Sequence, residues 1–294
     1  MPVNSTLRAM RGLSSVLVLA TLGACEKVVE LDVADGPVRL VVEGRLESPL
    51  EPASVTLLGR QSLRLTTTSP YFSNSPQPPA RGAVVTVRDD LGRVVAFPES
   101  STPGTYRTDS LVARAGRTYT LRIEWQGDRY EAVESLSSVA PIDSLYFMPR
   151  PKKDPAIDGL RATIDLRDPP VTRNYYLWDQ YVDGERLVSP DTVIRYRVVT
   201  NDEFYEGRRV RAYQPFDGRA VRRRQEVLVR QYSISEAVWR YYDALNRQVD
   251  GDGSPFGVPP SSVRGNVANL TSPSKPALGY FVASEVSERR ARVP

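Results

Sequence analysis

The chain has 294 residues, with 39 Lys or Arg against 35 Asp or Glu, no histidine and one cysteine. The near balance of charge gives no support for a nucleic-acid partner, and a single cysteine excludes internal disulfides, so folding must rest on burial. The lack of histidine excludes Ser-His-Asp and Cys-His catalysis and His-containing zinc sites. We therefore expect a protein that is not an enzyme and has no cofactor.

The first 24 residues have the order of a lipoprotein signal peptide. Arg8 and Arg11 form a basic start, residues 13–20 form an apolar stretch too short to span a bilayer, and residues 22–25 (LGAC) form a lipobox. Cleavage before Cys25 exposes its thiol for acylation. We therefore predict lipidation of Cys25 and attachment to the lipid bilayer through its acyl chains. The alternative is an ordinary signal peptide with a free cysteine nearby.

Residues 25–36 (CEKVVELDVADG) are typical of a short polar tether. From residue 38 onward the hydrophobic pattern takes a period of two, which predicts strands. Residues 118–125 (TYTLRIEW) are the clearest case, and a turn at residues 126–128 (QGD) predicts a hairpin with residues 129–133. Further short strands between turns predict an Ig-like β-sandwich domain over residues 37–139.

A polar, proline-rich loop interrupts this first domain at residues 69–79 (SPYFSNSPQPP). Tyr71 and Phe72 lie inside it, and aromatic side chains on a stiff loop make good anchors for a partner or ligand. The alternative is a loop that covers a sheet edge and tucks both rings back onto the sheet.

A second β-rich domain is predicted over residues 140–285, after the proline-bearing joint SSVAP at residues 137–141. A capping box at residues 233–236 (SISE) and apolar residues at helical spacing predict one amphipathic helix over residues 235–248. Residues 286–294 are expected to be a polar tail. The remaining elements are predicted strands at residues 162–166, 175–178, 193–199 and 226–232, and a hairpin turn at residues 183–184 (DG).

An aromatic cluster marks the strand predicted at residues 175–178. Because side chains alternate along a strand, Tyr176 and Trp178 point to one face, and Tyr175 and Tyr181 point to the other. Two interpretations stay open. Tyr176 and Trp178 either pack in the core or form a platform that contacts a glycan or peptide ligand.

Three other groups of residues invite a chemical interpretation. The acid pairs Asp165/Asp168 and Glu203/Glu206 could serve a carboxylate-based hydrolase, against the simpler view that they are turn and surface acids. Residues 250–254 (DGDGS) begin like a calcium loop, but Pro255 stands where that loop needs glycine, so we expect no metal. Residues 222–224 (RRR) are expected to be a solvated strand, with an acidic partner as the alternative.

The order of these segments resembles one family, the domain of unknown function 4249 of Bacteroidota lipoproteins. The matching blocks are residues 25–27 (CEK), 40–46 (LVVEGRL), 69–74 (SPYFSN), 82–87 (GAVVTV), 104–111 (GTYRTDSL), 116–123 (GRTYTLRI), 141–147 (PIDSLYF) and 265–284 (GNVANLTSPSKPALGYFVAS). The resemblance implies an outer-membrane lipoprotein of the cell envelope, often encoded beside a TonB-dependent receptor. It also implies a first domain similar to transthyretin-like sandwiches, and it transfers no catalytic residue.

Composition, lipobox and resemblance together lead to a first functional hypothesis. The chain is expected to be a non-catalytic outer-membrane lipoprotein that serves a TonB-dependent transporter as an accessory or by presenting a ligand. The alternative is a surface module that binds a glycan or peptide through its aromatic face. A carboxylate-based hydrolase is the third hypothesis.

Overall fold

The computed structural model describes residues 36–51, 61–70, 73, 75–149, 159–187, 198–216, 220–249 and 263–294. Residues 37–69 and 73–294 form one compact unit. This unit is mainly β, which confirms the predicted fold class, and its described residues contain one helix.

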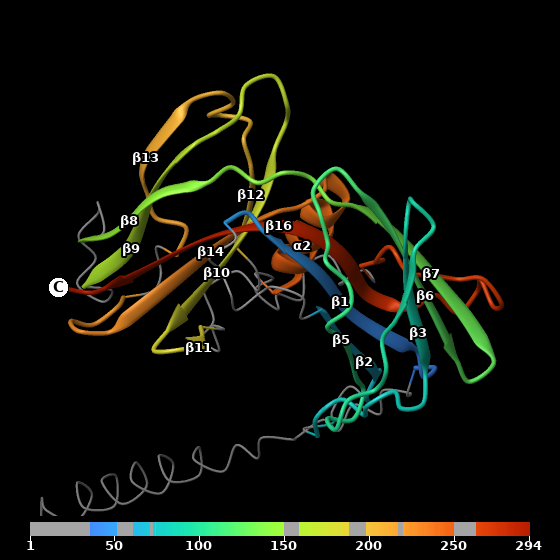
Figure 1. Cartoon of the computed structure of the whole chain (residues 1–294). Coiled ribbons are helices and arrows are strands. Elements are labelled where there is room, and N and C mark those ends of the chain that lie inside the picture. The colour runs from blue at the N-terminus through green and yellow to red at the C-terminus, as the bar shows by residue number, and fades with distance from the viewer. Residues whose placement is uncertain are drawn as a thin grey trace, which may run out of the picture. The chain divides into compact units, whose positions relative to one another are not determined.

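A large sheet of eight strands runs through the unit (Figure 1). Its strands follow the order β11-β10-β14-β16-β1-β2-β5, with β12 also paired to β10. All of these pairs are antiparallel except β1 with β16, which is parallel. The bounds are β1 (Leu40–Pro49), β2 (Gln61–Thr67), β5 (Thr105–Thr108), β10 (Tyr175–Val182), β11 (Glu185–Arg186), β12 (Val198–Asn201), β14 (Glu226–Ser233) and β16 (Leu278–Arg292).

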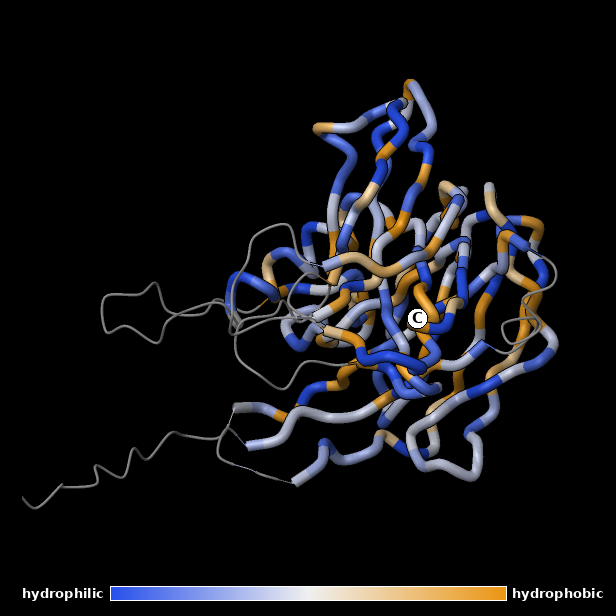
Figure 2. The backbone as a smooth tube through the Cα atoms, turned by 90° about the vertical axis from the view of Figure 1, so that its left-hand side faces the viewer, coloured by the Kyte–Doolittle hydropathy of each residue, from blue (hydrophilic) through white to orange (hydrophobic). Residues whose placement is uncertain are grey.

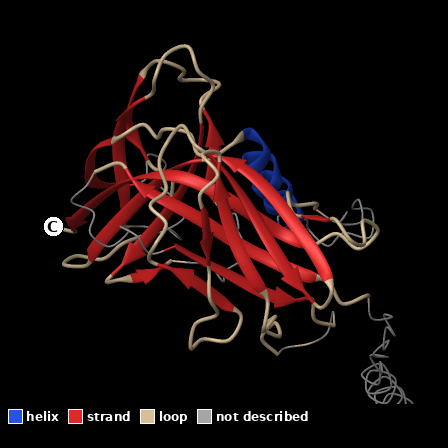
Figure 3. Ribbon diagram, turned by 45° about the vertical axis from the view of Figure 1, so that its right-hand side comes forward, coloured by secondary structure: helices blue, strands red, loops and turns tan. Residues whose placement is uncertain are grey.

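Two smaller sheets complete the described β structure (Figure 3). A five-stranded sheet has the order β15-β7-β6-β3-β4, and a three-stranded sheet has the order β13-β9-β8. The strands of the five-stranded sheet are β3 (Val84–Asp89), β4 (Val94–Ala96), β6 (Thr118–Trp125), β7 (Asp128–Ser135) and β15 (Ala268–Asn269). Those of the three-stranded sheet are β8 (Ile142–Pro149), β9 (Leu160–Arg167) and β13 (Arg209–Tyr213).

The two predicted glycine hairpins are present. Gln126 and Gly127 join β6 to β7 with φ angles of 48° and 84°, and Asp183 and Gly184 join β10 to β11 with φ angles of 52° and 88°. Positive φ at both central residues is the signature of the type I′ turn, whose twist matches that of the flanking strands. The local sequence therefore fixes both hairpin registers.

Three hydrophobic cores form among the described residues. The first contains residues from the five-stranded sheet and from β1, β2, β5 and β16, with Leu121 and Phe281 among them. The second joins the three-stranded sheet to one face of the large sheet, and the third lies on its other face, beneath the helix α2 (Glu236–Val249). Along the strands hydrophobic and hydrophilic residues alternate (Figure 2), so one face of a strand can be buried while the other stays polar.

The helix lies where the sequence predicts it. Ser235 occupies the cap position, and its Oγ accepts a hydrogen bond of 3.3 Å from the backbone N–H of Val238. The capping box predicted at residues 233–236 is wrong in this detail, because Ser233 ends β14 and its Oγ donates to the Ser137 carbonyl. Val238 and Tyr242 are buried against Leu177 and Tyr232 of the large sheet. The apolar face of the amphipathic helix α2 thus covers part of one face of the large sheet.

The domain boundary predicted at residues 139–140 lies where the hydrophobic core changes, because Leu136 belongs to the first core and Val139 belongs to the second. The hydrogen-bonded sheet nevertheless crosses this position, since β16 pairs with β1. The prediction of a polar tail at residues 286–294 is wrong. β16 extends to Arg292, and Val286 and Val293 are buried.

Glu134 is a buried acid where β7 approaches the start of α2. Its side chain is 6% exposed, and Asn266 Nδ2 donates to its carboxylate at 3.3 Å. Burial raises the pKa of Glu134 to about 7, although hydrogen bonds from Ser235 and Asn266 oppose the rise. The folded protein therefore holds this proton more tightly than the unfolded chain does.

This pKa predicts a pH dependence of stability. As pH rises from about 4.5 to about 7, the unfolded chain ionises Glu134 first, so the folded state loses stability across this window, by on the order of 3 kcal/mol in total. Glu134→Gln removes the loss, so the variant should be more stable than the parent at pH 8 and close to it at pH 4.5. Urea unfolding at both pH values checks this. Half-buried Glu131→Gln on β7 is a partial control, because that carboxylate pairs with Arg122. An equal effect of Glu134→Gln at both pH values would contradict the raised pKa.

Candidate functional site

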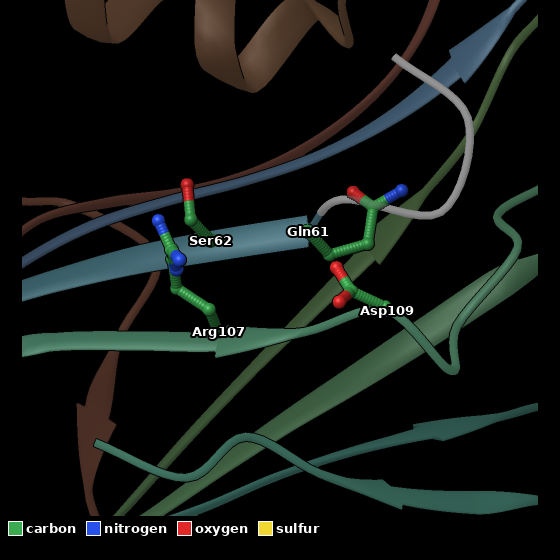
Figure 4. Close-up of a pocket in the computed structure, with 4 residues that line it drawn as sticks. All are labelled: Gln61, Ser62, Arg107 and Asp109. Atoms are coloured by element: carbon green, nitrogen blue, oxygen red, sulfur yellow. The ribbon is translucent and has the colours of Figure 1, made fainter. Parts of the chain in front are cut away.

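A cavity of about 310 Å³ lies at the β5 end of the large sheet (Figure 4). Among the described residues, its lining consists of Gln61 and Ser62 of β2, Arg107 of β5 and Asp109, which directly follows β5. All four side chains are polar. The cavity is therefore a candidate binding site for a polar molecule.

The strand period positions Arg107 at this cavity. Tyr106 and Thr108 point inward and are buried, so Arg107 between them points outward and is exposed. Arg107 is the direct cross-strand partner of Ser62, which is also exposed. The Tyr106 hydroxyl anchors the strand, since it donates to the Ala80 carbonyl at 2.8 Å.

Gln61 fixes one wall of the cavity. Its Oε1 accepts from the backbone N–H of Glu47 at 2.8 Å, and its Nε2 donates to the Glu47 carbonyl at 2.9 Å. Across the described residues, no side-chain hydrogen bond or ion pair engages the Arg107 guanidinium. Arg107 can therefore direct its N–H donors at a ligand.

A second cavity of about 480 Å³ adjoins the first. Arg107 and Asp109 line both cavities, and Glu99 stands in the second one. The Glu99 carboxylate accepts hydrogen bonds from the backbone N–H groups of Gly104 at 2.8 Å and Gly82 at 2.9 Å, which lower its pKa. The other described residues that line it are Ala96, Pro98, Ser100, Thr108 and Ser110.

The two cavities offer hydrogen-bond donors and acceptors side by side. The guanidinium of Arg107 suits a carboxylate or a pair of hydroxyls, while the carboxylates of Asp109 and Glu99 accept from hydroxyl or ammonium groups. A sugar or a short peptide carries this mixture of groups. The sequence reasoning missed Arg107 and Asp109 as site residues, because their neighbours depend on the pairing of β5 with β2.

Tyr176 and Trp178, two of the predicted contact residues, are each 1% exposed. The Tyr176 hydroxyl donates to Asp168 at 2.7 Å, and Trp178 Nε1 donates to Gln231 at 3.0 Å. Both rings belong to the second core, as the core interpretation requires, and neither offers a face to a ligand in this structure. The structure thus corrects the interpretation of this pair as a ligand platform.

The other predicted contact residues, Tyr71 and Phe72, lie outside the described residues, as does the lipidation site Cys25. The calcium-like segment at residues 250–254 lies outside them as well. In the ranges that the structure describes, no group of three or more His, Cys, Asp or Glu side chains is arranged to hold a metal ion.

The structure separates the acids proposed as catalytic pairs. Asp168 is fully buried, with Tyr176 and the backbone N–H of Gly207 as donors, and burial raises its pKa. Asp165 accepts instead from the Tyr146 hydroxyl and the backbone of Ala212, each at 2.9 Å. Asp165 and Asp168 therefore serve different internal hydrogen-bond networks.

The remaining charged candidates lie at the surface. Glu203 and Glu206 are exposed in the connection between β12 and β13. Residues 222–224 are exposed too, but they form a turn before β14 and not the expected strand, because Arg224 has a φ angle of 70°.

The fold and the cavity define a mainly β protein with a polar cavity at the edge of its central sheet. None of the helices in the described ranges has the length and apolar character that a membrane span requires. The chain belongs to the family described as domain of unknown function (DUF4249), whose model matches residues 26–290. This match confirms the resemblance found in the sequence. Among curated proteins, none matches the chain.

Proposed function

We propose that this chain is a non-catalytic lipoprotein of the outer membrane of Bacteroidota that binds a small polar ligand and presents it to a TonB-dependent transporter. The cavities shared by Arg107 and Asp109 carry the binding part of this proposal, because they place an exposed guanidinium and an exposed carboxylate side by side, and the guanidinium has no side-chain partner among the described residues. The lipobox at residues 22–25 supports attachment to the membrane.

The chemistry of the cavity favours a glycan or peptide ligand over an apolar one. Apolar ligands need a lining of aliphatic and aromatic side chains. Among the described residues, the first cavity is lined by one amide, one hydroxyl and two charged side chains. A sugar acid, which combines hydroxyls with a carboxylate, matches both Arg107 and Asp109.

The ligand hypothesis predicts a specific loss of binding. We expect glucuronic acid to bind the purified mature protein, and Arg107→Met to weaken that binding by roughly 10- to 100-fold, because a charged hydrogen bond contributes about 1.5–3 kcal/mol. Titration calorimetry with glucuronic acid, glucose and dialanine as probes measures this. Arg88→Met on β3 is the matched control, since Arg88 is exposed on another sheet. Equal affinity of the Arg107 variant and its control would exclude the cavity as the binding site.

The membrane anchor gives a second prediction. Cys25→Ser should move the mature protein from the membrane pellet to the soluble fraction, because each buried acyl methylene contributes about 0.8 kcal/mol to membrane binding. Fractionation and immunoblotting of cells that produce the full chain measure the shift. Retention of the variant in the pellet would mean that the chain is held by something other than an acyl group.

The transporter partnership is tested separately. Affinity capture of the lipidated chain from detergent-solubilised outer membranes should recover a TonB-dependent transporter in a stoichiometric amount. The Arg107→Met variant serves as a control that keeps the lipid anchor. Loss of the transporter from its eluate would mean that capture depends on the bound ligand, and recovery would mean that the two proteins dock directly. A transporter that is absent from the eluate of both proteins would remove this part of the proposal.

A further inference from the structure

β8 differs from the other strands at the sheet edges. A sheet edge exposes unpaired backbone groups, and proteins limit the resulting risk of association by keeping edge strands short or irregular. β4, β5, β11, β12 and β15 have between two and four residues each, and β13 has five with an irregular register. β8 has eight residues.

One edge of β8 has no strand partner among the described residues. β8 pairs with β9 on one side and is the last strand in the order β13-β9-β8. Within the described ranges, the backbone of residues 143–147 makes no hydrogen bond other than those to β9. The ends of the strand do have other partners. The Ile142 N–H donates to Ser287, and Gln214 Nε2 donates to the carbonyls of Met148 and Pro149. In antiparallel pairing, alternate residues direct both N–H and C=O away from the partner strand. Such groups along β8 can accept another strand.

The sequence of β8 limits this open edge to a short window. The register shifts between Ile142 and Ser144, so Asp143 forms an irregularity at one end, and Pro149 closes the other end. Between them, residues 144–148 (SLYFM) are uncharged. The two features that protect this edge strand, an irregular register and a proline, thus lie only at its ends. The backbone groups of residues 144–148 are left available for pairing with another strand.

The side chains of this window are incompletely covered. Leu145 and Phe147 pack against the second core but stay only half-buried, and Met148 is 39% exposed. Leu50, just beyond β1, is half-buried against the same core. A strand added beside β8 would cover Leu145 and Phe147 and could place apolar side chains of its own on this core.

We propose that β8 binds an extended, uncharged segment of a partner protein by β-strand addition. Main-chain hydrogen bonds to β8 would supply affinity, and alternate apolar side chains of the segment would supply specificity. The inference goes beyond ligand binding at Arg107 and does not depend on it, because the two sites lie on different sheets.

The size of the window favours a partner segment over a second copy of this chain. A window of five residues is about 17 Å long, and a strand added beside it would lie about 5 Å away. The surface that so short an edge can bury is far smaller than the roughly 1,200–2,000 Å² that stable complexes of two folded proteins bury. A flexible segment needs no wider surface, so it can use this edge alone.

Photocrosslinking in cells tests the proposal on the full-length, membrane-anchored protein. A benzophenone side chain is placed at Ser144, Tyr146 or Met148 in turn, and the crosslinked peptides are identified by mass spectrometry. In strand addition, each two-residue step along β8 should move the crosslink by two residues along one partner segment. Val133, which is 53% exposed on β7, provides the control position.

The outcomes are distinct. A two-residue progression along one partner supports the proposal, and Ser144→Lys together with Met148→Lys should then reduce the crosslink from Tyr146 at least fivefold while circular dichroism stays unchanged. Crosslinks to residues 142–149 of a second copy would overturn it in favour of self-association. Crosslinks no stronger than those from Val133, or scattered over several partners without the progression, would also overturn it.

Discussion

Gly279→Ala should destabilise the protein by about 2–5 kcal/mol, because it affects the parallel pairing of β1 with β16. Gly279 has a φ angle of +83°, and a Cβ atom there would lie 2.1 Å from the carbonyl oxygen of Val42, its direct partner in the sheet. Left-handed backbone costs alanine roughly 1–2 kcal/mol, and an overpacked contact with rigid backbone adds about 1–3 kcal/mol. Urea unfolding of the purified mature protein measures the loss.

A matched variant separates these two costs. Gly116 has a φ angle of +80°, but beyond Gly116 and its two chain neighbours no atom of the described residues lies within 4 Å of the position of its Cβ. Gly116→Ala should therefore lose only about 1–2 kcal/mol, from backbone strain alone. If both variants lost the same amount, the close approach of β16 to β1 would not be the cause, and the parallel register of these strands would be in question.

The local elements of this fold could be predicted because their signals are local. The strand at residues 118–125 follows from strict alternation, the hairpin turns from Gly127 and Gly184, and the helix from the apolar spacing after residue 233. Each of these signals spans fewer than about 15 residues. None of them depends on which distant strand becomes a neighbour.

The end of β16 was missed because its charges resemble those of a tail. Residues 284–293 (SEVSERRARV) contain five charged residues, yet two of them pair with a neighbouring strand in the structure. Glu288 accepts from Arg230 at 3.0 Å and Arg290 binds Glu226 at 2.7 Å, both across to β14. Glu288 and Arg290 lie on the same face of β16 as the buried Val286, beyond the residues of that strand that the third core contains. Only the position of β14 gives them partners.

The cavity at Arg107 was missed for a related reason. Alternation assigns Arg107 to the outer face of β5, but its partner Ser62 is 45 residues away in the sequence, and the two are brought together only by the pairing of β2 with β5. Conversely, the sequence placed Tyr176 and Trp178 on one face of β10 without showing what covers that face. The three-stranded sheet covers it, since the ring of Tyr213 of β13 packs against that of Trp178 with the two centroids 5.4 Å apart.

The burial of Trp178 gives the last prediction. Trp178→Ala should destabilise the protein by about 3–5 kcal/mol, because it removes a fully buried indole, leaves a cavity between β10 and β13, and deprives Gln231 of its hydrogen-bond donor. Phe204→Ala is the matched control, since the Phe204 ring is 83% exposed and its removal should change stability by less than about 0.5 kcal/mol. Urea unfolding compares both variants with the parent. A Trp178 variant as stable as the parent, but defective in ligand binding, would show that this ring belongs to a binding surface and that the core lies elsewhere.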